Sequence, residues 1–484
     1  MNDQRSTLQS LFREENRYAN FGAVLMSLIV MGFRCHVATI IEIESPITAF
    51  CGLNGTGKST LLQLAAAAYR KASDGNHRYY IKDFIVSGTL DPAPFCPDAS
   101  VLYSYWQENR TIKGVVITRS DPEKRWRGYK KQPPRTVYFA GMGLYLPKIE
   151  IRDFVVRNAS KITITNTQPL PERSKQCACK ILGYSYESMD ANEVKHAGRT
   201  GEVVTVMRSG KAYSEANMGC GEGRVQHIIR VLETLPEKSL VLLEEPETSL
   251  HPSAQHEFGK YLIDVCINRR HQVFITTHSE YLLTALPSSS RIYLDRTPSG
   301  LRSIKGITTA QAISLMTGGH DKALHILVED EVAEAILTEL LRRGDSTFLK
   351  TVKIHQSGDT KTIQSVMKSL KDTGLPVAAV RDGDKEGNPS ENIFKLPGNL
   401  PPEKELFSSS KVKELIREDY YINVDDFLAT AQGDDHHNWF QRLSDLASIN
   451  RIALIQLTSK VYVGGLSENE VDTLIEPLKA AIRI

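Results

Sequence analysis

Three things are scarce in this sequence, and each scarcity limits what the protein can be. Seven cysteines among 484 residues do not make a disulfide framework. The longest uncharged apolar run, from Phe21 to Phe33, has 13 residues, whereas a membrane span needs about 20. That run also lacks the basic start and the small-residue cleavage site of a signal peptide. We therefore expect a cytoplasmic protein with no membrane segment.

The third feature that the sequence lacks is an excess of charge of one sign. Lys and Arg total 59 and Asp and Glu total 57, which leaves a net charge of +2. This balance excludes a protein that coats nucleic acid by bulk charge, although it permits a local basic patch. The content of 41% hydrophobic and 24% charged residues is ordinary for folded domains, and at about 150 residues per domain the length predicts two to four of them.

The strand and helix signals fall into two series. Up to about residue 320, strands and helices alternate, apart from an irregular segment at about 75–215 whose topology the sequence does not define. Alternating strands and helices predict a mostly parallel sheet. A new series begins after Gly319, and about 75 residues at the end have the pattern of polar amphipathic helices. We therefore predict an α/β protein with two domains, 1–320 and 321–484.

A glycine-rich loop lies between a predicted strand, Ile47–Cys51, and a Leu- and Ala-rich helix signal, Leu61–Tyr69. Residues 52–60, Gly-Leu-Asn-Gly-Thr-Gly-Lys-Ser-Thr, fit the pattern G-x-x-x-x-G-K-[ST]. In that pattern backbone N–H groups and the helix N-terminus hold phosphate oxygens, and the lysine reaches the β and γ phosphates. The flanking strand and helix favour a phosphate loop over a chance glycine turn. The candidate nucleotide-binding residues are Asn54, Gly55, Gly57, Lys58, Ser59 and Thr60, with Ser59 also a Mg²⁺ ligand.

Later blocks indicate which kind of phosphate-loop protein this is. The apolar strand Ser239–Leu243 ends in two acids, which suits a Mg²⁺ held by Glu244 through water and an attacking water oriented by Glu245. The strand Gln272–Thr276 is followed by His278, a candidate contact for the γ-phosphate. Taken singly, paired glutamates are often helix caps and such a histidine is often structural. The ordered set favours ATP binding and hydrolysis, and its further candidate nucleotide contacts are Gly219 and Gly221.

Carboxylates also end two strands of the second series. Strand His325–Val328 leads to Glu329, and strand Val377–Val380 leads to Asp382-Gly-Asp384. On an extended segment Asp382 and Asp384 share one face. Three carboxylates at one sheet edge suit Mg²⁺ or Mn²⁺, and such ions activate water and stabilise the leaving oxygen of a phosphodiester. The alternative is an ordinary αβ domain with acidic loop ends.

Three weaker features have two interpretations each. Glu403 and Glu405 are extra metal ligands or a helix start. His436 and His437 are ligands or acid–base groups of the second site, or part of a helix cap. The basic stretch Arg119–Arg135, with aromatic residues interleaved, is a nucleic-acid contact or a solvated loop.

The first set of motifs resembles the ABC-type ATPase heads of the SMC and OLD (overcoming lysogenization defect) families. The resemblance covers about 22–290, with a divergent insertion at about 75–215. The Glu-Glu-Pro-Glu run followed by Leu-His-Pro is most similar to the OLD group. One departure is Gly219, where many relatives have a serine that contacts the nucleotide of a partner head. An ABC transporter subunit is disfavoured, because the appended αβ domain is foreign to that class.

The second set resembles the Toprim fold of topoisomerases, primases and OLD nucleases. Glu329 matches the family's glutamate, and Asp382 and Asp384 match its Asp-x-Asp. The resemblance makes Lys361, in the turn Ser-Gly-Asp-Thr-Lys, a candidate phosphate contact. The family usually has glycine after the glutamate, whereas this chain has Asp330.

Together the resemblances imply an ATP-binding and ATP-hydrolysing, divalent-metal-dependent DNA endonuclease of OLD type in bacterial anti-phage defence, of the Gabija-like or retron-associated kind. The expected cofactors are ATP and Mg²⁺, or Mn²⁺ at the Toprim site. The expected partners are DNA, further copies in a homodimer or higher even oligomer, and a second protein or nucleic-acid component of a defence system. Two alternatives stay open: an ATP-dependent sensor or scaffold with a degenerate Toprim domain that controls a separate toxic effector, and a DNA-repair ATPase.

Overall fold

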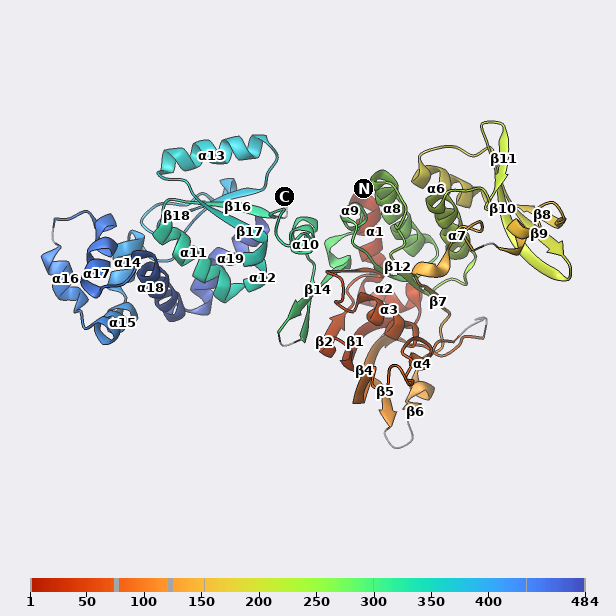
Figure 1. Ribbon diagram of the computed structural model, residues 1–484, viewed down its shortest axis with the longest axis horizontal. Coiled ribbons are helices and arrows are strands. Elements are labelled where there is room, and N and C mark those ends of the chain that lie inside the picture. Colours follow the sequence, from red (N-terminus) through yellow and green to blue (C-terminus); the bar gives the residue numbers. More distant parts are fainter. Residues whose placement is uncertain are drawn as a thin grey trace. The chain divides into compact units, whose positions relative to one another are not determined.

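The computed structural model describes residues 2–73, 78–120, 125–151, 153–298, 300–431 and 433–482, and Figure 1 shows its ribbon. The chain forms two compact units, residues 1–309 and 310–484. The sequence predicts this boundary near residue 320, about ten residues later than the structure places it. Helix α10 (Thr309–Met316) accounts for the difference, because its Ala310 packs against the hydrophobic core of the second unit. In the described parts of the chain no helix is both long and apolar enough to cross a membrane.

A six-stranded sheet lies at the centre of the first unit. Its strands are β3 (Ile47–Cys51), β7 (Val137–Ala140), β12 (Leu240–Glu244), β13 (Gln272–Thr276), β14 (Arg291–Thr297) and β15 (Gly300–Lys305). Their order is β15-β14-β3-β13-β12-β7, and all neighbours except β14 and β15 are parallel. β3 and β13 are buried along their whole length, as apolar strands of a covered parallel sheet are. The predicted mostly parallel sheet is confirmed.

Helices accompany this sheet in the alternating pattern that the sequence predicts. They are α1 (Asn2–Phe12), α2 (Glu14–Phe21), α3 (Lys58–Ala66), α7 (Cys220–Thr234), α8 (Pro252–Asn268) and α9 (Glu280–Ala285). Helix α3 contacts β7, β12 and β13, and α8 contacts β3 and β13. Helix α3 therefore carries the phosphate loop at its start and packs against the strands that end in the predicted acids.

A second, antiparallel sheet explains much of the segment whose topology the sequence left undefined. It consists of β1 (Val24–Phe33), β2 (His36–Glu42), β4 (Phe95–Gln107), β5 (Arg110–Ser120) and β6 (Arg125–Arg127), in the order β2-β1-β4-β5-β6. Val24 of β1 lies opposite Trp106 of β4, so strands from before and after the phosphate loop form one sheet.

The region predicted as one insertion at about 75–215 is therefore several separate pieces. β4 to β6 belong to the antiparallel sheet and β7 belongs to the central sheet. A further four-stranded sheet has the order β11-β10-β9-β8, and α6 connects two of its strands. These elements are β8 (Thr163–Pro169), α6 (Glu172–Leu182), β9 (Ser188–His196), β10 (Arg199–Arg208) and β11 (Lys211–Ser214), with the short helices α4 (Ile81–Phe84) and α5 (Phe154–Arg157) before them.

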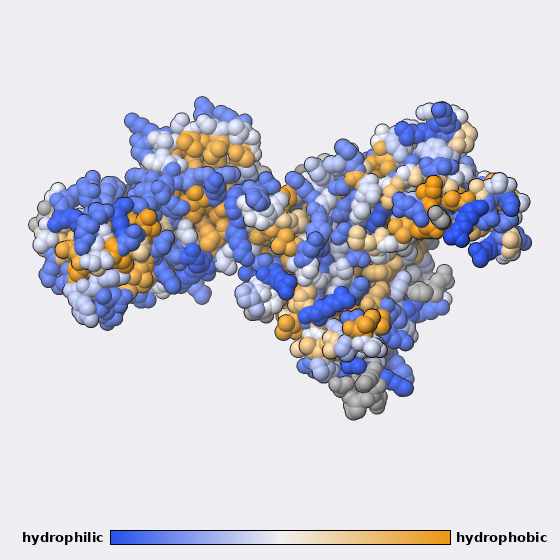
Figure 2. Space-filling view, in the orientation of Figure 1, coloured by the Kyte–Doolittle hydropathy of each residue, from blue (hydrophilic) through white to orange (hydrophobic). Residues whose placement is uncertain are grey.

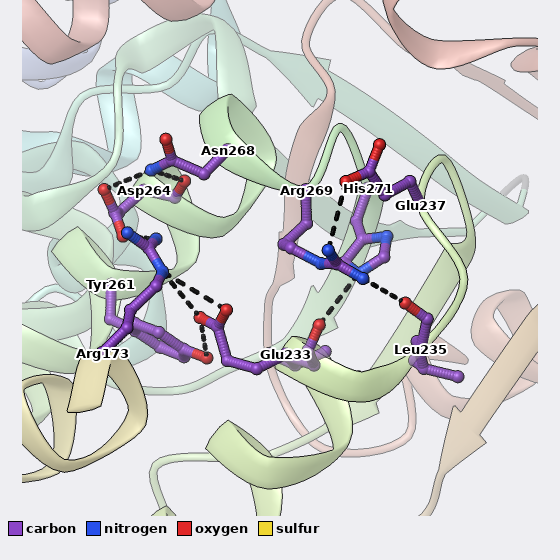
Figure 3. Close-up of polar contacts among 10 residues, drawn as sticks. Arg173, Glu233, Leu235, Glu237, Tyr261, Asp264, Asn268, Arg269 and His271 are labelled. Atoms are coloured by element: carbon purple, nitrogen blue, oxygen red, sulfur yellow. Dashed lines mark hydrogen bonds and ion pairs between the residues drawn. The ribbon is translucent and has the colours of Figure 1, made fainter. Parts of the chain in front are cut away.

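Arg173 connects this peripheral part to helices α7 and α8 (Figure 3). Its Nε lies 3.3 Å from Glu233 Oε2 of α7, and its Nη2 pairs with Asp264 of α8. The Tyr261 hydroxyl of α8 also donates a hydrogen bond to Glu233, at 3.3 Å. Charged groups from three elements therefore fix α6 against α7 and α8.

The second unit is built on a four-stranded parallel sheet. Its strands are β16 (Leu324–Val328), β17 (Val352–Gln356), β18 (Val377–Arg381) and β19 (Ile393–Lys395), in the order β17-β16-β18-β19. The accompanying helices are α11 (Glu331–Gly344), α12 (Ser346–Thr351) and α13 (Thr360–Asp372). The C-terminal helices, which the sequence predicts, are α14 (Pro402–Ser408), α15 (Ser410–Tyr420), α16 (Val424–Thr430), α17 (Trp439–Ala447), α18 (Arg451–Gly465) and α19 (Glu468–Ala480).

The two faces of this sheet are covered differently. Ile326 and Val328 belong to a large core with α11 and the C-terminal helices, whereas Leu327 packs with Ile363 and Met367 of α13. This is the alternation that a strand imposes on its side chains. Figure 2 shows hydrophobic residues at the surface where Figure 1 places α13. The carboxyl ends of β16 and β18 are adjacent, which determines where the predicted acids lie.

Candidate functional site

The loop between β3 and α3 has the backbone that a phosphate loop needs. Gly55 and Gly57 have φ of 77° and 75°, in the left-handed region that glycine adopts readily. A side-chain carbon at position 57 would lie 2.2 Å from His36 Nε2, so only glycine fits there. His36 is buried, and burial lowers its pKa, so the neutral ring donates from Nε2 to the Gly57 carbonyl at 3.1 Å.

Lys58 begins α3 and is almost fully buried. Its Nζ donates to the carbonyl oxygens of Gly52 and Leu53, both at 3.0 Å, so the side chain folds back over the loop. Burial lowers the pKa of Lys58, against the opposing charges of Glu245 and Glu244. Ser59 and Thr60 follow in the first turn of α3, and Asn54 and Gly55 lie in the loop before it.

The two acids of the later motif lie beside this loop. Glu244 ends β12 and pairs in register with Thr276 of β13, which in turn pairs with Phe50 of β3. Glu245 has a φ of 43°, and its N–H donates to Thr276 O at 3.2 Å and to Thr276 Oγ1 at 3.1 Å. The strand order therefore brings both acids to the carboxyl edge where β3 enters the phosphate loop.

His278 belongs to the same group of residues. Its Nε2 lies 3.7 Å from Glu245 Oε1. Burial and the charge of Lys58 lower its pKa, against the raising effect of Glu245, so the ring is neutral near pH 7. Lys58, Glu244, Glu245 and His278 thus come together from three separate segments, as the sequence predicts.

The sequence did not predict that Glu247 contacts the loop that carries His278. Glu247 is 6% exposed, and its Oε1 accepts hydrogen bonds from Thr277 Oγ1 and, at 3.3 Å, from the His278 N–H. Burial raises its pKa. Glu247 therefore fixes the loop that carries His278. Its signal in the sequence was the third acid of the Glu-Glu-Pro-Glu run.

The glycine segment before α7 contacts the loop that follows these acids. Gly219 precedes the helix as its N-cap, and Gly221 lies in its first turn. A side-chain carbon at Gly221 would lie 2.4 Å from Ser249 O. Buried Arg224 donates from Nη2 to Glu245 O at 3.2 Å. The segment and the acidic loop are thus fixed to each other.

In the second unit, Glu329 and Asp382 follow the adjacent strands β16 and β18. Lys385 Nζ lies 2.5 Å from Glu329 Oε2 and 3.8 Å from Asp382 Oδ2. Asp382 is 6% exposed, and burial together with the charges of Glu329 and Asp330 raises its pKa to about 7. Among the described residues, Glu329 Oε1 and Asp382 Oδ1 have no hydrogen-bond partner.

The other predicted members of this site are more exposed. Residues after β18 form a turn, in which Lys385 N donates to Asp382 O at 3.1 Å, so the face-sharing argument for an extended segment does not apply. Asp384 is exposed, and its charge contributes to the raised pKa of Asp382. Lys361 is exposed in the first turn of α13, and Gly358 N, in the turn before it, donates to Glu329 O at 3.0 Å. The turn therefore lies against the end of β16.

Of the weaker candidates, Glu405 has the contacts of a helix start, whereas Glu403 contacts His437. Glu405 accepts from the backbone N–H groups of Asn399 and Leu400, both at 3.3 Å, as an acid at a helix start does. Glu403 is 2% exposed and lies 2.9 Å from His437 Nδ1. His437 Nδ1 is also 4.0 Å from Asp330 Oδ2. Burial would lower the pKa of His437, but the hydrogen bond and charge of Glu403 outweigh it and raise that pKa.

The basic stretch Arg119–Arg135 is not one surface. Arg135 is buried, and its guanidinium donates to the backbone carbonyls of Ala23, Lys238 and Phe21. Its role is therefore structural. Trp126 stacks on Phe33 with ring centroids 5.5 Å apart. Lys130 and Lys131 are exposed, and Lys124 lies outside the described residues.

Comparisons with known proteins identify the first unit's chemistry in part. Residues 27–92 match the family described as "AAA domain", and residues 189–284 match "AAA domain, putative AbiEii toxin, Type IV TA system". The chain is 40% identical over 247 residues to Protein ea59 of Escherichia phage lambda, a match that covers 50% of this chain and 47% of that relative. The chain thus spans about half the length of that relative. The family matches identify an AAA-type ATPase domain.

Two solved structures have weaker similarity. An SMC head domain from Thermotoga maritima is 15% identical, with a TM-score of 0.32, over 58% of this chain and 98% of that one. The C-terminal region of the Xanthomonas campestris pv. campestris OLD protein is 16% identical, with a TM-score of 0.24, over 34% of this chain and 98% of that one.

Proposed function

We propose that this chain is an ATP-regulated, divalent-metal-dependent DNA endonuclease of OLD type that acts in anti-phage defence. The proposal combines an ATPase site in the first unit with a carboxylate site in the second. Its partners would be DNA, further copies of the chain in an even oligomer, and a second component of a defence system. The two halves of the proposal have separate support.

For the ATPase half, the support is the convergence of Lys58, Glu244, Glu245 and His278 at one sheet edge. Backbone N–H groups of the phosphate loop and Lys58 would hold the β and γ phosphates of ATP. Ser59 and Glu244 would hold Mg²⁺, which neutralises phosphate charge. Glu245 would orient the attacking water, and neutral His278, 3.7 Å from Glu245, would contact the γ-phosphate. Positioning and electrostatics of this kind are most of what phosphoryl transfer requires.

For the nuclease half, one observation carries the proposal: buried Asp382 and partly buried Glu329 follow adjacent strands, and each has an oxygen with no hydrogen-bond partner among the described residues. Such a pair is unfavourable unless a proton or a cation balances it. Glu329, Asp382 and Asp384 would hold Mg²⁺ or Mn²⁺, and the oxygen-only ligand set fits these ions. A bound ion there would supply an activated water and stabilise the leaving oxygen. Lys361 would contact the phosphate.

The test is DNA cutting by the purified full chain with Mg²⁺ or Mn²⁺ and with chelator. We expect nicking of supercoiled DNA only with metal. Asp382→Ala should reduce cutting at least ~100-fold, because the buried ligand is lost, and should leave ATP hydrolysis within about twofold, since the two sites belong to different units. Asp372→Ala, an exposed acid of α13, is the matched control and should cut at the parental rate. Metal-independent cutting, or full cutting by Asp382→Ala, would contradict the proposal.

A second candidate function has one specific observation in its favour. Lys385 already places an ammonium group 2.5 Å from Glu329, which is the charge balance that a degenerate site would have. In this case the chain is an ATP-dependent sensor or scaffold that controls a separate toxic effector. It predicts no cutting by the parent protein and full protection of cells by Asp382→Ala, while Lys58→Ala abolishes protection.

A further inference from the structure

A cluster of mixed ligands lies close to Asp330, outside the carboxylate pair described above. Glu403 comes from the first turn of α14, and His436 and His437 come from the short 3₁₀ helix η5 (His436–Asn438). One ligand atom from each of the three lies within 4.8 Å of the others. Glu403 Oε1 is 2.9 Å from His437 Nδ1, and Glu403 Oε2 is 3.9 Å from His436 Nε2. Three groups from two separate segments therefore converge on one point.

Glu403 uses only one of its two carboxylate oxygens: Oε1 contacts His437 Nδ1, and Oε2 is left without a partner among the described residues. The side chain of Glu403 is only 2% exposed. Within the described part of the chain its Oε2 makes no hydrogen bond. His436 Nε2 lies 3.9 Å from this Oε2, beyond hydrogen-bond distance. A buried carboxylate oxygen in this condition is unfavourable, and an ion between Glu403 and the two rings would satisfy it.

The surroundings orient the ligands. Asp435 Oδ1 lies 3.4 Å from His436 Nδ1, on the opposite side of the ring from Nε2, and accepts from the His437 N–H at 3.1 Å. A carboxylate on one ring nitrogen is the arrangement that leaves the other nitrogen as a metal ligand. Behind the cluster, Phe407 of α14 packs on Trp439, with ring centroids 6.1 Å apart. The ligands therefore lie on packed elements.

We propose that Glu403, His436 and His437 form a binding site for a divalent transition-metal ion, with Zn²⁺ as its probe. Two imidazoles and one carboxylate are ligands that Zn²⁺ and its neighbours prefer, whereas Mg²⁺ and Ca²⁺ prefer oxygen alone. Three protein ligands leave a position open in a four-coordinate ion. Asp330 Oδ2, 4.0 Å from His437 Nδ1, faces this region, and Asp330 follows Glu329 directly. The ion would thus lie beside the carboxylate pair.

The experiment measures Zn²⁺ binding by the chelator-treated full chain with calorimetry, in excess Mg²⁺ to occupy oxygen-only sites. We expect one tight site per chain. The double variant His436→Gln, His437→Gln should bind Zn²⁺ at least ~100-fold more weakly. These side chains are 24% and 56% exposed, so the variant should fold, which its unfolding temperature without metal checks. His320→Gln, an exposed histidine of the same unit, is the matched control.

A second readout excludes an effect of folding. Co²⁺ in a site with two imidazoles and one carboxylate has visible absorption bands, and we expect them in the parent, in His320→Gln and in Asp382→Ala, but not in the double variant. Unchanged Zn²⁺ affinity in the double variant would overturn the inference. Loss of the site in Asp382→Ala alone would also overturn it. The inference does not depend on nuclease activity, because a protein that binds Zn²⁺ here and cuts no DNA would contradict only the proposed function.

Discussion

At the scale of single residues, the two sites have one arrangement in common: an ammonium group lies close to carboxylates at the carboxyl edge of a parallel sheet. In the first unit Lys58 interacts with the charges of Glu244 and Glu245. In the second, Lys385 contacts Glu329 and lies 3.8 Å from Asp382. A lysine in this position binds phosphate, is displaced by a cation, or stays as the permanent charge balance of a site that holds no metal. The motif around Lys58 identifies the first case, and no comparable motif surrounds Lys385.

The residue-scale prediction concerns the ATPase site. Lys58→Ala removes the charge that would face the β and γ phosphates, so we expect ATP affinity to fall at least ~10-fold and hydrolysis to vanish. Glu245→Gln keeps the shape of the side chain but removes the group that would orient water, so hydrolysis should fall ~10²-fold while ATP binding is retained. Fluorescent-nucleotide binding and phosphate release measure the two effects. Hydrolysis by Glu245→Gln at the parental rate would show that this residue has another role.

The limits of sequence reasoning at this scale are physical. Lys58 could be predicted because its position follows from a local loop pattern. Lys385 could not, and Glu403 and His437 kept two interpretations each, because their positions depend on turns and helix packing that bring distant residues together. The turn after β18 also exposes Asp384, which a strand-based argument would have placed beside Asp382.

At the scale of elements, His271, which Figure 3 labels, joins three segments of the first unit. The ring is fully buried, and the residue comes just before β13. Its Nε2 lies 3.0 Å from Leu232 O of α7, and its Nδ1 accepts from the Ser239 N–H, before β12, at 3.2 Å. These bonds fit a neutral ring with its proton on Nε2. A second proton on Nδ1 would point at the Ser239 N–H, so the folded state resists protonation.

The element-scale prediction follows from this tautomer. Burial lowers the pKa of His271 to about 4, from an ordinary 6.5. Between these values the unfolded chain binds a proton that the folded chain does not, so the stability from this group is present above pH 6.5 and is lost as pH falls toward 4. From pH 7 to pH 5 we expect a loss of about 2 kcal/mol. His271→Asn should make the urea-unfolding free energy less dependent on pH, and an identical pH slope in parent and variant would contradict this account.

Element pairing shows why the fold could be predicted only in part. β3 is followed directly by α3, and β12 by α8 and β13, so the existence of these apolar strands and helices and their parallel pairing follow from pattern and connection rules. β1 and β4 pair across the whole phosphate loop and α3, and nothing local in either strand specifies this partner. Only β4 to β6 of this antiparallel sheet therefore fall in the segment that the sequence predicts as an insertion.

At the scale of the whole molecule, the open end of α7 suggests how copies of the chain assemble. Gly219, the N-cap of α7, is exposed, and apart from its own atoms and those of its two chain neighbours no described atom lies within 4 Å of the place a side-chain carbon would take there. A helix N-terminus attracts anions through its free N–H groups and its dipole. In ABC-type heads, which the sequence resembles, this segment contacts the nucleotide bound by a partner head. We therefore expect the γ-phosphate held by one copy to recruit the α7 end of another.

The molecule-scale prediction uses Glu245→Gln to keep ATP bound. Light scattering should show a larger, even-numbered assembly with ATP than without it. Adding Lys58→Ala should prevent the ATP-dependent increase, because the nucleotide no longer binds. Adding Gly219→Asp should also prevent it while leaving nucleotide affinity nearly unchanged, since a carboxylate at the α7 end repels phosphate. A mass of one chain in every condition, or association that Gly219→Asp leaves intact, would mean that the nucleotide does not join copies through α7.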